Sequence, residues 1–149
     1  MTDSPETAAP APQAAPVPAP RPFATLKVDP QKVADGVWIR HPEADDQLCV
    51  RRLWCAQHLR AIEQAALDYE AKNGSGSAQT AEGNKHCEAV GLAAGVITNW
   101  RLAKDPTRPY DAAAMAALLV EPGFDDLKAW VMLEASKRGN FRPAALAGN

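Results

Sequence analysis

Histidine and cysteine are the residue types in this sequence that could bind a metal ion or act as nucleophiles. The sequence contains three of each: His41, His58, His86, Cys49, Cys55 and Cys87. His86 and Cys87 are adjacent, and adjacent side chains on a helix diverge by about 100°, so they do not chelate one ion. Cys49 and Cys55 lack the close pairing of zinc ligands. We therefore expect no metal site and no cofactor, and we expect reduced thiols packed as small apolar residues.

The other patterns that could support a reaction have simpler structural explanations. A cysteine–histidine nucleophile pair needs contact in space, which the separated positions do not indicate. The acidic pairs Asp45–Asp46 and Asp125–Asp126 fit a turn and a helix start. The Gly74–Ser77 stretch lacks the Lys-Ser/Thr and the preceding strand of a phosphate-binding loop. The sequence therefore predicts no catalytic residue and a protein that is not an enzyme.

Size and charge restrict the classes of partner. The 149 residues suffice for one domain, and a formal net charge of −2 provides no strong field of either sign. Nucleic-acid-binding proteins usually carry a clustered basic surface, whereas Arg51–Arg52 and Lys137–Arg138 are isolated pairs. The acidic, polar first residues do not resemble a secretory signal, and the longest apolar run, 89–97, is far shorter than the roughly 20 residues that span a bilayer. We expect a cytoplasmic protein that binds neither nucleic acid nor membrane.

The composition divides the chain into an arm, a domain and a tail. Residues 1–22 are dominated by alanine and proline. Proline removes backbone donors and alanine offers little area to bury, so we expect a disordered, partly polyproline-II arm. A simple tether is favoured over the alternative, a ligand for an SH3-like partner. The folded domain is expected over 23–141, and a flexible tail over 142–149.

The hydrophobic pattern of the domain predicts a mainly α fold with a short N-terminal β-hairpin, an α+β class. Residues 36–40 and 47–54 are rich in β-prone side chains and flank a turn that contains proline and aspartate. Residues 25–28 are a further extended candidate. Apolar side chains at helical spacing then predict a four-helix core. The four helices are expected over residues 56–71, 81–100, 112–121 and 124–138.

The sequence also indicates how three of these helices pack or begin. The first has an apolar face that includes Leu59. The second is apolar over more than half its circumference, which is typical of a central helix. Its Cys87, Gly91 and Gly95 form a thin strip where another helix can approach closely, and we interpret this strip as a packing device. Asp111 is a good N-cap for the third helix.

The four tryptophans are the best candidates for contact with a partner. They are Trp38, Trp54, Trp100 and Trp130. Tryptophan is common at binding hot spots because it buries a large area with few rotatable bonds. For each of them a place in the core is the favoured explanation, and Trp38 and Trp54, in the hairpin region, are the better candidates for contact.

A set of spaced residues resembles the tail assembly chaperones of long-tailed bacteriophages (siphophages). The resemblance covers about residues 25–141 and is greatest in the C-terminal third. The matching positions are Gly36–Ile39, Val50–Leu53, Asn99–Trp100, Pro109–Asp111, Ala116, Leu118–Leu119, Pro122, Phe124, Trp130, Ala135 and Asn140–Phe141. The Ala/Pro arm and the Gly/Ser connector after Asn73 depart from the pattern of that family.

The resemblance implies a chaperone that coats the helical tape measure protein, keeps it soluble and helps recruit tail tube subunits. Such a protein acts in the host cytoplasm and is absent from the mature virion. It often exists in a short form and a longer, frameshifted form, and it can self-associate. The residues that we expect to contact partners are Trp38, Leu53, Trp54, Tyr110, Trp130 and Phe141. The alternatives are a permanent structural or adaptor component of a phage particle and a small helical scaffold protein.

Overall fold

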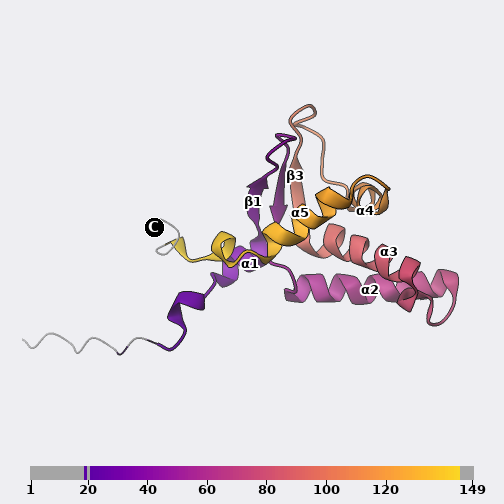
Figure 1. Ribbon diagram of the computed structural model, residues 1–149, viewed down its shortest axis with the longest axis horizontal. Coiled ribbons are helices and arrows are strands. Elements are labelled where there is room, and N and C mark those ends of the chain that lie inside the picture. Colours follow the sequence, from indigo (N-terminus) through magenta and orange to yellow (C-terminus); the bar gives the residue numbers. More distant parts are fainter. Residues whose placement is uncertain (1–18, 20, 145–149) are drawn as a thin grey trace, which may run out of the picture.

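A small antiparallel sheet lies against a set of helices in this α+β fold, which is mainly helical as predicted (Figure 1). The structure, a computed structural model, describes residue 19 and residues 21–144. The expected disordered arm over 1–22 therefore lies almost entirely outside the described residues, as do residues 145–149 of the expected tail. The strands are β1 (Val37–Arg40), β2 (Gln47–Val50) and β3 (Ile97–Arg101). The α-helices of the described part are α1 (Pro30–Asp35), α2 (Ala56–Asn73), α3 (Ala81–Gly91), α4 (Ala112–Val120) and α5 (Asp125–Ser136).

The predicted hairpin is present, but it belongs to a sheet of three strands. β1 and β2 pair antiparallel, and β3 pairs antiparallel with the other side of β2. We expected β3 to be the end of a helix over 81–100, and that prediction is wrong. The helix ends at Gly91, a π-helical segment covers Leu92–Val96, and the chain passes directly into β3.

A β-bulge explains why the strand resembles a helix in sequence. The pairing moves from Asn99 to Ile97 on β3 while β2 advances by one residue, so Thr98 is the extra residue of the bulge. Ile97 and Trp100 are consequently both buried although they are three residues apart. A spacing of three is typical of a helix, whereas a regular strand alternates at a spacing of two.

The helices α2 and α3 run side by side (Figure 1). The predicted strip of small residues faces α2 from the end of α3 and from the π-helical segment. A Cβ atom added at Gly91 would lie 2.6 Å from Ile62 Cγ1, and one added at Gly95 would lie 2.6 Å from His58 Cα. The close approach of the two backbones therefore requires glycine at Gly95. The face of α2 differs from the prediction, because His58 and Ala65 are buried while Leu59 is 52% exposed. The π-helical segment approaches α2 at His58, whereas Leu59 lies on the exposed side of α2.

The N-terminal part of the domain contains a helix that the sequence analysis missed. Residues 25–28 are not a strand, because a 3-10 turn covers Ala24–Leu26 and α1 follows. The signals for α1 are local: the side chain of Asp29 accepts a hydrogen bond from the backbone of Gln31, and Pro30 occupies the first turn. The helix has only six residues, which is too short for hydrophobic periodicity to be recognised.

The end of the domain folds back onto its beginning. A 3-10 turn at Arg138–Phe141 buries the Phe141 side chain completely, and the Phe141 carbonyl accepts a hydrogen bond of 2.7 Å from the Asp29 backbone. The ammonium group of Lys32 donates to the carbonyl of Arg142 at 2.8 Å. The 3-10 turn and α1 thus pack together at the edge of the main hydrophobic core. Within the described residues, no helix has the length and apolar content needed to cross a membrane.

A candidate partner-binding cleft

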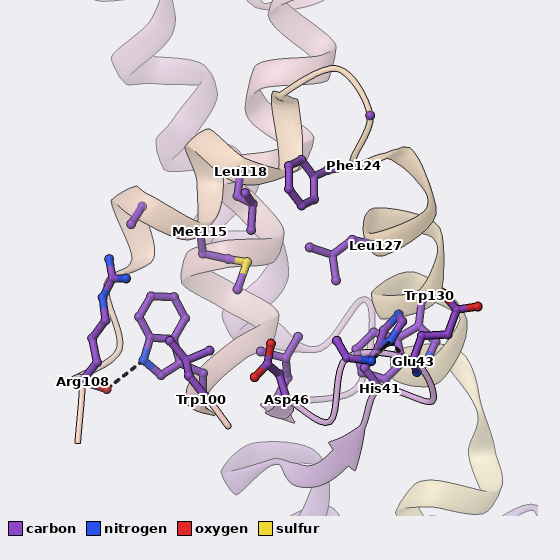
Figure 2. Close-up of a pocket in the computed structure, with 15 residues that line it drawn as sticks. His41, Glu43, Asp46, Trp100, Arg108, Met115, Leu118, Phe124, Leu127 and Trp130 are labelled. Carbon is purple, nitrogen blue, oxygen red and sulfur yellow. Dashed lines mark hydrogen bonds between the residues drawn. The ribbon is translucent and has the colours of Figure 1, made fainter. Parts of the chain in front are cut away.

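An open cleft of about 530 Å³ lies between the turn of the hairpin and the helices α4 and α5. Figure 2 shows Met115 and Leu118 from α4 facing Leu127 from α5, with Phe124 at the start of α5 nearby. The remaining lining residues are His41, Glu43, Ala44, Asp46, Leu48, Trp100, Leu102, Arg108, Ala114, Gly123 and Trp130. Most of this lining is apolar. Burial of a partner's apolar side chains in the cleft would therefore favour binding.

The position of α4 is set by polar contacts at its start. The side chain of Asp111 accepts a hydrogen bond from the Ala114 backbone at 3.1 Å, as the sequence predicts for an N-cap. Tyr110 is half-buried, and its hydroxyl donates to the carbonyl of Ala93 in the π-helical segment. Burial, helped by the charge of Asp111, raises the pKa of Tyr110, so the hydroxyl remains a neutral donor. These contacts anchor the beginning of α4 to the core.

Trp100 connects one wall of the cleft to the loop that precedes α4. Its indole Nε1 donates a hydrogen bond of 2.9 Å to the Arg108 carbonyl, drawn as a dashed line in Figure 2. Its ring also meets Tyr110 edge to face, with the ring centroids 5.1 Å apart. Trp100 is 8% exposed. A buried indole with its donor satisfied forms a rigid wall for the cleft.

The turn of the hairpin forms the opposite wall and is also held in place. His41 packs edge to face on Trp130, with centroids 4.7 Å apart, and its Nδ1 accepts hydrogen bonds from the backbone of Glu43 and Ala44. Asp46 accepts a hydrogen bond of 2.7 Å from the backbone of Ala103, which follows β3. The carboxylates of Glu43 and Asp46 therefore lie along this wall, while Arg108 lies on the other side.

Only some of the predicted contact residues lie at the cleft. Trp130 lines it, and Tyr110 supports it from behind through Trp100 and Ala93. Phe141 is fully buried, so the expectation that it contacts a partner is corrected: it fills the core, because the last 3-10 turn folds inward.

The other three predicted contact residues lie elsewhere on the molecule. Trp38 is on β1 and is 37% exposed, with the guanidinium of Arg101 stacked over its ring. Trp54 follows the hairpin, is 60% exposed and has a left-handed backbone, with φ of 66°. Its backbone N–H donates to Nδ1 of the buried His58 at 2.9 Å. Leu53 is half-buried and its backbone donates to the carbonyl of Ala135. The structure does not bring these three residues to the cleft.

The sequence analysis missed several residues of the cleft, namely His41, Met115, Leu118, Phe124 and Leu127. Four of them are apolar residues of the expected helices. Met115 is buried, whereas Leu118, Phe124 and Leu127 are half-buried, and the exposure of these three depends on how far α4 and α5 separate, which no local pattern encodes. The proline- and acid-rich turn that contains His41 was the available signal for the opposite wall.

The titratable groups of the described residues are characterised by their spacing, which bears on metal binding, and by the burial that shifts a pKa. Among residues 19 and 21–144, no three histidine, cysteine or acidic side chains gather as metal ligands would. Burial lowers the pKa of His58, which the charge of Glu88 partly opposes, so the imidazole is neutral near pH 7. Burial, together with Glu70, raises the pKa of Cys87 and makes this thiol a poor nucleophile. The cleft offers shape and apolar surface, with carboxylates on one wall.

Comparison of the chain with protein-family models, with curated proteins and with solved structures gives no match.

Proposed function

We propose that this protein is a tail assembly chaperone of a long-tailed bacteriophage, which binds the tape measure protein through the cleft between the hairpin turn, α4 and α5. In this function it keeps the tape measure protein soluble and helps to recruit tail tube subunits. It acts in the host cytoplasm and leaves before the virion matures. One observation carries the proposal: several of the residues that resemble this family lie at the cleft. Trp100, Leu118, Phe124 and Trp130 line it directly.

The physical basis is the shielding of exposed apolar helices. A long helical partner displays stripes of apolar side chains that associate with one another unless they are covered. A cleft with aromatic walls can take the anchor side chains of one helix, as in other helix-in-groove interactions. Several copies of the chaperone along one tape measure protein would add avidity to a modest affinity at each site.

Co-expression with the cognate tape measure protein tests the proposal. We expect the wild-type chain to raise the soluble fraction of that protein and to co-purify with it. Leu118→Glu places a charge in the apolar cleft, and Trp130→Ala removes part of its wall, so each should reduce co-purification by about tenfold or more. Leu133→Gln is the matched control, because Leu133 is 56% exposed on α5 and is not part of the cleft.

Three outcomes would contradict the proposal. The first is a wild-type chain that neither binds the tape measure protein nor changes its solubility. The second is equal binding by the cleft variants and the control, which would remove the cleft from the mechanism. The third is the presence of the protein in purified tails, detected by mass spectrometry, because a permanent component of the particle would remain there.

A further inference from the structure

The outer face of the sheet carries a second surface, separate from the cleft. Side chains alternate along a strand, and cross-strand neighbours share a face. Trp38, Arg40 and Arg101 therefore lie on the face opposite to the buried Ile39 and Trp100. All three are exposed, and Arg40 and Arg101 both pair with Gln47 of the central strand.

Arg101 is preorganised on this face by an aromatic ring. Its guanidinium carbon lies 3.7 Å from the centroid of Trp38, a distance at which the planar group stacks on the indole. Stacking occupies one flat side of the guanidinium and leaves the N–H groups along its edge free to donate. The ring also limits the rotamers of Arg101, so less entropy is lost when a ligand binds.

The charge of this surface is not neutralised within the described chain. No carboxylate among the described residues lies within ion-pair distance of Arg101. Arg40 pairs with Asp45 at 2.9 Å, but both side chains are well exposed, at 65% and 70%, so the pair is weak and can open. Two guanidinium groups therefore face solvent beside one aromatic ring.

We propose that the Arg101–Trp38 stack, with Arg40 beside it, binds carboxylates of an acidic segment of a partner protein. The planar fork of N–H donors on an arginine matches the two oxygens of a carboxylate. A nucleic acid is the weaker fit, because affinity for a phosphate backbone needs many cations along one surface, and this chain has a formal net charge of −2. The proposal is independent of the tape measure function, because it concerns a different face and a different chemistry.

Titration of the full ¹⁵N-labelled chain with hexaglutamate at low ionic strength, followed by NMR, tests this site. We expect the signals of the Trp38 indole and the Arg101 side chain to shift with hexaglutamate and not with hexaglutamine. Arg101→Gln should lower the affinity by about tenfold, as expected for a lost charge-assisted hydrogen bond. Arg101→Lys keeps the charge but loses the planar fork of donors. Its affinity for hexaglutamate should therefore lie between those of the wild type and Arg101→Gln.

The control is Arg60→Gln, which removes the same charge from an exposed position on α2. It should bind hexaglutamate as the wild type does. An equal loss in Arg60→Gln and Arg101→Gln would overturn the proposal, because the attraction would then be general. No shift at Trp38, or unchanged affinity in Arg101→Gln, would also overturn it. Tighter binding of a thymidine hexanucleotide than of hexaglutamate would refute an acidic protein segment as the ligand.

Discussion

Replacing Gly95 with alanine should disrupt a close backbone contact, the approach of the π-helical segment to α2. The new Cβ atom would lie 2.6 Å from His58 Cα, 2.8 Å from the carbonyl oxygen of Gln57 and 2.9 Å from Ala61 Cβ. Two of these atoms belong to the backbone and cannot rotate away. Ordinary carbon–carbon contacts are about 3.5–4.0 Å, so the two segments must separate by about 1 Å.

The expected loss of stability follows from the contacts that this separation weakens. The segment carries the fully buried Leu92 and Val96, and a gap of up to 1 Å forfeits a quarter to a half of the dispersion energy at each contact. Overpacking of a core typically costs about 1–3 kcal/mol. We therefore expect Gly95→Ala to reduce the free energy of unfolding by about 2–4 kcal/mol.

Gly91→Ala is the matched control on the same strip. Its Cβ atom would also meet an atom at 2.6 Å, but that atom is Ile62 Cγ1, and the nearest backbone atom, Ile62 Cα, lies 3.6 Å away. Ile62 is only half-buried, so its side chain can adopt another rotamer. Alanine also favours a helix over glycine by about 1 kcal/mol, which offsets the cost of that adjustment. We expect a change within about 1 kcal/mol.

Urea unfolding, followed by tryptophan fluorescence and circular dichroism, measures the free energy of unfolding of both variants. If the dependence of this free energy on urea concentration is the same as in the wild type, the values can be compared directly. The expected order is a large loss for Gly95→Ala and a small change for Gly91→Ala. If Gly95→Ala loses less than about 1 kcal/mol, the close backbone contact does not exist as described. A loss for Gly91→Ala as large as that for Gly95→Ala would show that side-chain freedom does not decide the cost.

Two further predictions concern buried polar groups. Tyr110→Phe removes the hydroxyl that donates to the carbonyl of Ala93 and should cost about 1–2 kcal/mol in urea unfolding. The control, Tyr69→Phe, should cost less, because the Tyr69 hydroxyl makes no hydrogen bond to the described residues. Lowering the pH below about 6.5 should destabilise the protein, because His58 takes up a proton in the unfolded chain near its ordinary pKa of 6.5 and resists it in the folded one. The loss from this site is at most about 1.4 kcal/mol per pH unit, and His58→Leu should reduce the dependence of the unfolding free energy on pH.

Local signals in the sequence were sufficient for much of the helical architecture. Asp111 caps α4 as predicted, because an N-cap depends on one side chain and the backbone a few residues away. The Gly91 and Gly95 strip meets α2, because only a helix face without side chains permits that approach. The hairpin appears where β-prone runs flank a turn. The signal for each of these features lies within a short stretch of the sequence.

Long-range packing decided the features that the sequence did not show. Ile97 and Trp100 have a spacing that fits either a helix or a bulged strand, and pairing with β2 selects the strand. Phe141 is buried because the chain end meets α1 more than a hundred residues away. Periodicity predicts that a side chain such as Leu127 faces another element, but the separation of α4 and α5 determines whether that space is filled or left open as a cleft. Local sequence specifies which faces are apolar, whereas contacts between distant segments determine which of those faces remain exposed.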